Sequence, residues 1–378
     1  MTSDKQAMSK CLDILILAFC PPRNRQGVDL NRALLAHAYR TKLIQLDVPC
    51  DSARSITGIT TPKARWLWHL HLGAAVIRLK MLAKAICLPH RVTIVLNLPA
   101  LLPGVILKVF FGTRLIFYTL EHSPICAANR WLLRRFCDAV IDVEENRLSL
   151  LLAMIGRSLP SFVLYNIPHR VNPQMLRPRM RVWLAEKGLA KPDDLLLVYS
   201  GSYQKYCYLE TLVEWAGEFP DNVKLILMMT EVPEHLRISG SRHVIIVPPQ
   251  THEELYDWLS DCDVSLLPYE GTSDNIRFCS PQKLFDSLAC GVPVLGSCRP
   301  LIQKIVDQYG CGQTIDFTDH HAFTVAWKWF QKRRADAFRS HAFRAHGEFN
   351  YETQAERLID FLQKNVLVDI TLTKHTAC

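Results

Sequence analysis

The sequence predicts an α/β protein of two Rossmann-like, doubly wound parallel-sheet domains. Short apolar runs of four to seven residues, rich in Val, Ile and Leu, alternate with longer amphipathic stretches. Such runs are typical of parallel strands buried on both faces, and the stretches between them suit crossover helices. The alternation occurs twice and is interrupted around 166–173 by two prolines and two asparagines. A length of 378 residues suffices for two domains.

Each half of the chain supplies its own set of strands and helices. In the first half the expected strands are 12–17, 43–46, 92–96, 115–118, 139–143 and 162–165, and the expected helices are 30–39, 66–87, 100–111, 129–136 and 146–155. In the second half the expected strands are 195–199, 223–229, 243–247, 264–267 and 292–295, and the expected helices are 208–219, 252–260, 281–290 and 301–309.

The domains expected from this pattern cover 1–170 and 171–350. A helix and tail over 351–378 follow, as a candidate to cross back to the first domain. Within that segment, Ala355, Leu358, Ile359 and Leu362 share one face of an amphipathic helix.

Charge is distributed unevenly between the two halves. Residues 1–190 carry 26 Lys and Arg against 11 Asp and Glu, a net charge of +15, whereas residues 191–378 carry 18 against 25, a net charge of −7. A basic half attracts anionic lipid headgroups and nucleic acid through the same Coulomb term. No nucleic-acid recognition motif accompanies the charge, so we expect no nucleic-acid partner.

The cysteines and apolar stretches indicate the cellular setting. None of the 13 cysteines forms a Cys-x-x-Cys pair, so reduced thiols are expected. The stretch 92–112 resembles a membrane span, but Asn97, Pro99, Pro103 and Lys108 interrupt it, which favours strand, turn and helix. We expect a cytoplasmic chain that binds peripherally to the inner face of the membrane.

The segment 279–294 is the most informative one for function. Ser280 is a good N-cap residue, and Pro281 suits the first helical position. Gly291 can adopt the left-handed conformation that ends a helix, and Pro293 forbids continuation. A helix of about ten residues is therefore expected.

The beginning of this helix is a candidate phosphate site. Free N–H groups of the first turn and the helix dipole attract anions. Lys283 adds a positive charge, Leu284 belongs to the apolar stripe, and Asp286 can accept hydrogen bonds from ribose hydroxyls. The alternative is a solvated Lys/Asp pair on an ordinary capped helix.

The runs 261–269 and 280–294 resemble the nucleotide-binding half of GT-B glycosyltransferases, in particular the large retaining group that includes sucrose-synthase-like and mannosyltransferase-like enzymes. In that group an Asp-Val strand ends in Pro-Tyr, here at Tyr269, and the helix Glu that holds ribose corresponds to Asp286. A second Glu of many members, eight positions earlier, is replaced here by Phe278. Glu270 or Asp274 is a candidate substitute.

The resemblance extends to two further segments of the second half. The strand 195–199 and the turn Ser200-Gly201-Ser202 resemble the family's first strand and glycine turn, which implies diphosphate contacts from Gly201 and Ser202. Lys205 is the nearby cation with an implied phosphate role, against the alternative of a surface lysine. The loop beginning at Val247 corresponds to the family's base-binding backbone.

In the first half, Glu121 and His122 follow the apolar strand 115–118. The resemblance implies a catalytic acid or His at such a strand end, and the alternative is a structural histidine. The loop between the first strand and helix contains Arg23, Arg25 and Gly27, which are candidate acceptor or phosphate contacts. This loop lacks a G-x-G-x-x-G pattern, which argues against a dinucleotide oxidoreductase.

The stretch 66–87 mixes tryptophans with basic residues, a composition that suits a membrane interface; the alternative is a core-facing helix with a solvated basic side.

The resemblance implies that 1–170 is an acceptor-binding domain and 171–350 a nucleotide-sugar-binding domain. It implies transfer of a sugar from a nucleotide diphosphate sugar to a saccharide or lipid-linked glycan in polysaccharide biosynthesis, with retention and with no metal or other cofactor. Three alternatives remain open. They are a nucleotide-sugar epimerase, an inverting transferase, and a non-catalytic GT-B-like partner of a biosynthetic complex.

Overall fold

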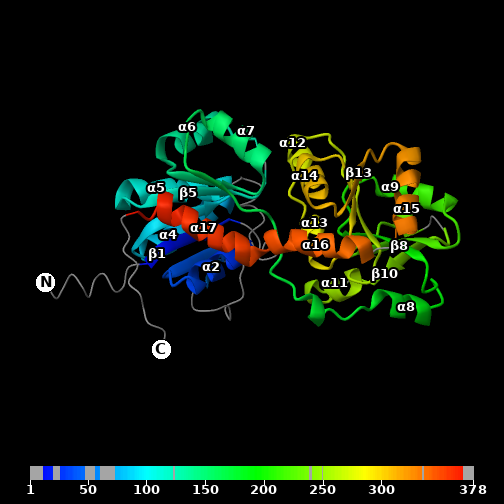
Figure 1. Cartoon of the computed structure of the whole chain (residues 1–378). Helices are drawn as coiled ribbons and strands as arrows, with labels where there is room; N and C mark the ends of the chain where they lie inside the picture. Colours follow the sequence, from blue (N-terminus) through cyan, green and yellow to red (C-terminus); the bar gives the residue numbers. More distant parts are fainter. Residues whose placement is uncertain are drawn as a thin grey trace. The chain divides into compact units, whose positions relative to one another are not determined.

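The computed structural model describes residues 12–19, 26–46, 56–59, 73–121, 124–237, 241–248, 250–333 and 336–368. Internal contacts divide the chain into two units. The N-terminal unit consists of Met1–Tyr165 with Ala355–Cys378, and the second unit is Asn166–Gln354. Figure 1 shows both units with their elements labelled.

The N-terminal unit contains a seven-stranded sheet in the order β3-β2-β1-β4-β5-β6-β7, and its strand pairs are parallel. From β1 the chain adds β2 and β3 on one side and then β4 to β7 on the other. The topological switch point of the fold therefore lies between β1 and β4. The strands are β1 (Leu12–Ala18), β2 (Thr41–Leu46), β3 (Ile56–Ile59), β4 (His90–Leu96), β5 (Arg114–Thr119), β6 (Ala139–Asp142) and β7 (Ser161–Val163). The predicted α/β class with parallel sheets is therefore confirmed for this unit.

Helices cover both faces of this sheet. One face is covered by α2 (Gln26–Ala36), whose Leu30 and Leu34 are fully buried. The other face is covered by α4 (Gly73–Ile86), α5 (Leu101–Phe111), α6 (Ala127–Phe136) and α7 (Glu145–Ile155). A short 3-10 helix, η1 (Leu98–Ala100), joins β4 to α5, which confirms strand, turn and helix over 92–112. Among the described helices, none has the length and apolar character that crossing a bilayer requires.

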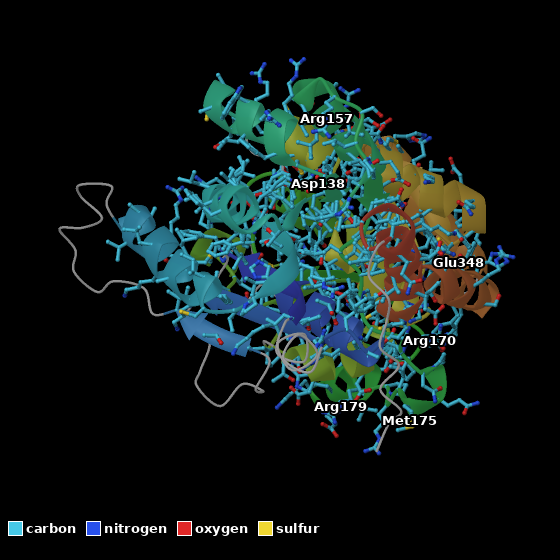
Figure 2. The ribbon with its side chains drawn as sticks, turned by 90° about the vertical axis from the view of Figure 1, so that its left-hand side faces the viewer. Asp138, Arg157, Arg170, Met175, Arg179 and Glu348 are labelled. Carbon is cyan, nitrogen blue, oxygen red and sulfur yellow. The ribbon has the colours of Figure 1, made fainter. Side chains whose placement is uncertain are left out.

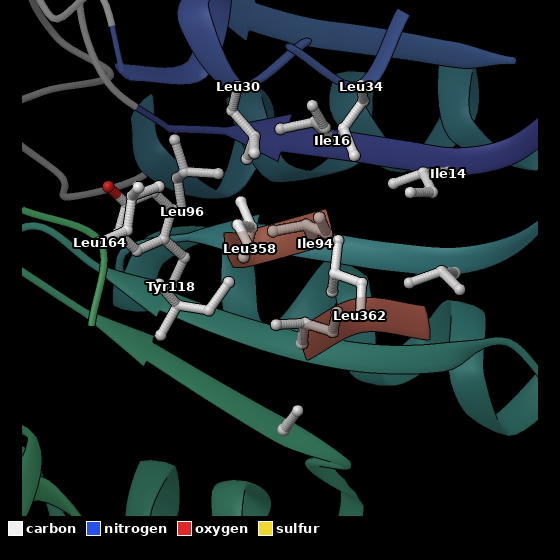
Figure 3. Close-up of a cluster of buried hydrophobic side chains, with 14 of the residues drawn as sticks. Ile14, Ile16, Leu30, Leu34, Ile94, Leu96, Tyr118, Leu164, Leu358 and Leu362 are labelled. Atoms are coloured by element: carbon white, nitrogen blue, oxygen red, sulfur yellow. The ribbon is translucent and has the colours of Figure 1, made fainter. Parts of the chain in front are cut away.

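The helix α17 (Tyr351–Asn365) brings the far end of the chain into the N-terminal unit. Leu358, Ile359 and Leu362 pack in the same cluster as Ile94 and Tyr118 of the sheet (Figure 3). Gln363 also donates a hydrogen bond from Nε2 to the hydroxyl of Tyr39 at 3.1 Å. The apolar stripe of this helix thus completes a core whose strands lie more than 200 residues earlier in the sequence.

The second unit contains a six-stranded parallel sheet in the order β10-β9-β8-β11-β12-β13. Its strands are β8 (Leu195–Gly201), β9 (Val223–Met229), β10 (Val244–Val247), β11 (Val264–Leu267), β12 (Val294–Ser297) and β13 (Gly312–Ile315). From β8 the chain adds β9 and β10 on one side and β11 to β13 on the other, so the switch point lies at the ends of β8 and β11.

The helices of the second unit are α8 (Met180–Glu186), α9 (Leu209–Trp215), α10 (Glu234–Arg237), α11 (His252–Leu259), α12 (Asp274–Arg277), α13 (Gln282–Ala289), α14 (Pro300–Tyr309), α15 (His320–Arg333) and α16 (Asp336–Glu348); 3-10 turns occur at η2 (Pro173–Met175) and η3 (Ala216–Glu218). The sequence prediction missed β3, β13, α8, α10, α12, α15 and α16. The two strands are only four residues long, which leaves little apolar periodicity to detect.

Candidate nucleotide site of the second unit

The candidate site is built where β8 ends and α13 begins. Gly201 is the last residue of β8 and has a φ of +119°, a conformation that only glycine adopts readily. A β-carbon at this position would lie 2.6 Å from Cε of Lys283, which belongs to the first turn of α13. The glycine turn and the helix beginning, each of which the sequence analysis gives as a candidate phosphate contact, therefore lie against each other.

Lys283 is held over the end of β8 by aromatic residues. Its Nζ donates a hydrogen bond to the hydroxyl of Tyr199 at 2.5 Å and lies 3.8 Å from the centroid of the Tyr199 ring and 5.8 Å from that of Tyr269. Burial lowers the pKa of Lys283 to about 8, since the ammonium loses hydration. A bound anion would stabilise the charged form of this lysine.

The tyrosine also fixes the glycine turn. The hydroxyl of Tyr199 donates a hydrogen bond to the carbonyl oxygen of Ser202 at 2.9 Å. Lys283, Tyr199 and Ser202 therefore form one chain of hydrogen bonds from the helix to the turn. Both segments that are expected to carry phosphate contacts are thus positioned by the same side chain.

The beginning of α13 differs from the prediction in one respect. The N-cap residue is Pro281, with φ −76° and ψ 122°, and the helix spans eight residues rather than about ten. Ser280 does not cap the helix, because its hydroxyl instead accepts a hydrogen bond from the backbone N–H of Asn166 at 3.3 Å. Gly291 has a φ of +71°, which confirms the predicted helix end.

The absence of a side-chain cap leaves donors available at this helix beginning. In the described part of the chain, the backbone N–H groups of Gln282 and Lys283 have no hydrogen-bond acceptor, whereas that of Leu284 donates to the carbonyl of Pro281 at 3.0 Å. Two free N–H groups at a helix N-terminus, beside a lysine ammonium, form an arrangement that binds anions.

Asp286 lies one turn further along α13 and is 5% exposed. Its Oδ1 accepts a hydrogen bond from the hydroxyl of Tyr256 of α11 at 3.1 Å. Burial raises the pKa of Asp286 to about 7, and the Tyr256 hydrogen bond opposes this shift. Within the described residues its Oδ2 has no partner, yet this atom is not among those wholly closed to solvent. A buried carboxylate with one oxygen available suits a ribose hydroxyl.

The remaining predicted residues of this unit lie around the same strand ends. Ser202 and Lys205 are exposed in the loop after β8. A phosphate contact by Lys205 stays a prediction. Leu284 is fully buried beneath the helix. Val247 ends β10, and Tyr269 follows β11, where it pairs with Cys207 in a single antiparallel bridge.

Sequence reasoning missed three side chains that shape the site. Tyr199 and Tyr256 are described above, and both read in the sequence as ordinary core positions. The third is Arg299, which follows β12. Its Nη2 donates to the carbonyl of Tyr269 at 3.1 Å, and its guanidinium lies against Gly271. A cation just after a strand was the available signal for Arg299.

Phe278, at the position where the family places a Glu, is half-buried beneath the guanidinium of Arg277, whose Cζ lies 5.2 Å from the ring centroid. Asp274, the candidate substitute, is exposed in the first turn of α12. The helix α12 thus exposes both a carboxylate, Asp274, and a cation, Arg277.

In the N-terminal unit, Glu121 is exposed after β5, and His122, Arg23 and Arg25 lie outside the described residues. The backbone leading to Glu121 is held firmly. Asn97 Oδ1 accepts from the N–H of Leu120 at 2.9 Å, and Arg147 Nη1 donates to the carbonyl of Leu120 at 3.3 Å. The catalytic roles of Glu121 and His122 remain predictions.

Gly27 lies in the first turn of α2 and is buried against the sheet. A β-carbon there would lie 3.4 Å from Ala18 and 3.5 Å from both Leu43 and Leu96. Its α-carbon therefore faces the core, and Gly27 can contact a ligand only through its backbone. Its role as an acceptor or phosphate contact stays a prediction.

Comparison with known proteins relates this geometry to a fold. No protein-family model matches the chain. No curated protein matches it by sequence. Solved structures do match. HepE of Anabaena in complex with UDP is 15% identical with a TM-score of 0.70, over 93% of this chain and 100% of HepE. HepE has also been solved with UDP-glucose.

Two further structures agree with this match. Sucrose-phosphate synthase of Thermosynechococcus elongatus is 16% identical with a TM-score of 0.70, over 95% of this chain and 100% of that chain. The α,α-trehalose 6-phosphate synthase of Burkholderia multivorans is 9% identical with a TM-score of 0.65, over 95% of this chain and 100% of that chain. With its two parallel-sheet units, the chain has the fold of the GT-B glycosyltransferases.

Proposed function

We propose that the chain is a glycosyltransferase whose donor is a nucleotide diphosphate sugar. The diphosphate binds at the turn 201–202 and at the free N–H groups that begin α13, where Lys283 neutralises part of its charge. Asp286 accepts hydrogen bonds from the ribose. The observation that carries this proposal is the contact between Lys283 and Gly201, which joins the turn and the helix into one anion site.

Both the matched structures and the local chemistry support the donor. HepE binds UDP and UDP-glucose, and this chain shares its fold. A diphosphate leaving group is stabilised by preorganised N–H donors and a cation, which are the groups that this site supplies. We therefore propose transfer with retention and without a metal, to a saccharide or lipid-linked glycan acceptor in polysaccharide biosynthesis.

One observation favours a second candidate, a non-catalytic GT-B-like partner. The Phe278 and Arg277 pair replaces the carboxylate that many similar enzymes place before this helix. A chain that binds the donor without turning it over would be consistent with that replacement. In that case the nucleotide site would remain, and sugar transfer would be lost.

Calorimetric titration with UDP, GDP, ADP and CMP tests the donor site. We expect one nucleoside diphosphate to bind well above the others, and Lys283→Met to weaken it by about tenfold or more, which corresponds to roughly 1.4 kcal/mol. Lys187→Met, at an exposed position of the same unit, is the matched control. If no nucleotide binds, the proposed donor site is wrong.

Release of free nucleotide from the preferred donor sugar then separates the two candidates. Slow hydrolysis that stops in His122→Ala supports the transferase. Tight donor binding with no release, whether or not saccharides are added, supports the non-catalytic partner. The anomeric configuration of the product, read by NMR, tests retention, and activity in the presence of a chelator tests the absence of a metal.

A further inference from the structure

Large apolar side chains are exposed at one edge of the N-terminal unit. Phe110 and Phe111, at the end of α5, are 76% and 54% exposed, and Trp131 of α6 is 59% exposed. The Trp131 ring packs edge-on against Phe136, with ring centroids 5.7 Å apart. Aromatic side chains rarely remain so exposed in groups without a partner surface.

Cations surround these aromatic residues. Arg134 and Arg135 are exposed in the last turn of α6, and Arg157 is exposed before β7. Three hydrogen bonds or ion pairs hold the segments together. Arg157 Nη1 donates to the carbonyls of Arg134 at 3.0 Å and Cys137 at 3.3 Å, and Lys108 Nζ of α5 pairs with Asp138 at 2.5 Å. Figure 2 labels Asp138 and Arg157, which lie near each other on this unit.

Phe110, Phe111, Trp131, Arg134, Arg135 and Arg157 together are called the basic aromatic edge. Its place follows from topology, because a helix that connects two parallel strands returns to the amino end of the second strand. The ends of α5 and α6 therefore lie near the amino ends of β5 and β6. Asn97 and Glu121 follow the carboxyl ends of β4 and β5, at the opposite edge of the sheet.

Charge complementarity identifies what covers the basic aromatic edge. The helices α4, α5 and α6 contain three, one and three Lys or Arg residues, respectively, and no Asp or Glu. Asp138, which follows α6, has a carboxylate that is already paired with Lys108. A cationic surface with projecting Trp and Phe side chains fits the interface of an anionic bilayer, where aromatic rings insert at headgroup level and cations meet lipid phosphates.

We propose that the basic aromatic edge docks the chain on an anionic membrane surface. The carboxyl edge of the same sheet then stays away from the headgroups and open to ligands. This proposal is independent of the nucleotide site, because the residues of the edge lie in the other unit. It differs from the sequence expectation, which placed the membrane contact at 66–87; residues 66–72 of that stretch lie outside the described structure.

Vesicle co-sedimentation of the full chain tests the proposal. We expect binding to vesicles of phosphatidylcholine mixed with phosphatidylglycerol, weaker binding to phosphatidylcholine alone, and release by salt. Phe110→Ser with Phe111→Ser should lower the partition coefficient about tenfold. Arg134→Gln with Arg135→Gln should lower it by a similar factor, roughly tenfold or more.

The controls use exposed residues of the second unit. Met175→Ser with Val182→Ser matches the loss of apolar surface, since these residues are 70% and 59% exposed, and Lys187→Gln with Lys332→Gln matches the loss of charge. All four double variants should retain their melting temperature and nucleotide affinity. The proposal is overturned if the edge variants bind vesicles as well as the controls do. It is also overturned if the wild-type chain does not bind vesicles but forms a dimer that the edge variants convert to a monomer.

Discussion

The aliphatic part of the Lys283 side chain lies across the α-carbon of Gly201, so close that a β-carbon there would be 2.6 Å from Cε. Two constraints therefore converge on position 201, since its φ of +119° already requires glycine. The residue that permits the turn also makes room for the cation. A change at Gly201 should consequently affect stability and anion binding together.

Gly201→Ala is expected to lower the free energy of unfolding by about 1–3 kcal/mol and to weaken nucleotide binding, because the methyl group displaces Lys283. Gly217→Ala is the matched control, since Gly217 lies in the same unit with no atom within 4 Å of its β-carbon position. Thermal denaturation and calorimetry measure the two effects. Unchanged nucleotide affinity in Gly201→Ala would contradict the coupling.

The affinity for a nucleotide sugar should depend on pH through Lys283. Its pKa of about 8 lies below the ordinary value, so the ammonium loses its proton as pH rises above 8 and the site loses a positive charge. Above pH 8, where Asp286 with its pKa of about 7 is already ionised, we expect affinity for UDP-glucose to fall by up to about tenfold per pH unit. UDP-glucose is the suitable probe because it has no terminal phosphate that titrates in this range.

Lys283→Met provides the comparison, with weaker binding and a pH profile that is flat above pH 8. A steep profile that survives in Lys283→Met would assign the titration to another group.

Asp286→Asn should separate stability from binding. The pKa of Asp286 is raised to about 7, so the folded state holds a proton that the unfolded state has lost between about pH 4 and 7. The resulting stabilisation is present at low pH and is lost as pH rises through 7. Asparagine avoids that loss, and the melting temperature of the variant relative to the wild type should rise from pH 5 to pH 8.

The same variant should bind nucleotide more weakly, since a neutral amide oxygen is a weaker hydrogen-bond acceptor than a carboxylate oxygen. Tyr256→Phe is the comparison, because it removes the hydrogen bond to Asp286 and leaves the carboxylate in place. Asp286→Asn with full nucleotide affinity would remove the ribose assignment.

Asn97 should store backbone strain that its side-chain hydrogen bond offsets. Its φ of 65° and ψ of 162° fall in a region that is strained for any residue but glycine, and its Oδ1 holds the N–H of Leu120. Asn97→Ala keeps the strain and loses the hydrogen bond, whereas Asn97→Gly loses the bond and relieves the strain. We expect Ala to destabilise by about 1–3 kcal/mol more than Gly in chemical denaturation. Equal stabilities would show that the strain is not stored there.

Leu362→Ala should destabilise the chain by about 2–5 kcal/mol, because the fully buried side chain completes the core of the N-terminal unit. Lys364→Ala, two residues away and paired only with Asp360 at the helix surface, is the control and should cost less than about 0.5 kcal/mol. Chemical denaturation followed by circular dichroism distinguishes them. Equal effects of the two substitutions would mean that α17 is not part of that core.

The elements that the sequence predicted correctly are those with strong local signals. The strands β4, β8 and β9 are rich in Val, Ile, Leu and Met, and the end of α13 is marked by Gly291 and Pro293. The helix beginning was assigned less well. Ser280 has the chemistry of an N-cap, but the backbone N–H of Asn166, more than 100 residues away, takes up its hydroxyl. Tertiary contacts of this kind leave no mark in the local sequence.

The candidate site shows the same division. Gly201, Lys283 and Asp286 could be selected from residue type and spacing together with the family resemblance. Their partners Tyr199 and Tyr256 could not, because an apolar strand and an amphipathic helix hide a functional hydroxyl among core positions. The basic aromatic edge was equally hidden, since only the fold shows that Phe110 and Trp131 are exposed while neighbouring apolar residues are buried.

A crystal structure of the chain with a bound nucleoside diphosphate tests the central claim most directly. The account predicts phosphate oxygens within hydrogen-bond distance of the backbone N–H groups of Gln282 and Lys283 and of Lys283 Nζ, with the ribose at Asp286. A diphosphate bound elsewhere on the chain, with Lys283 still resting on Tyr199 and the N–H groups of α13 unoccupied, would contradict it.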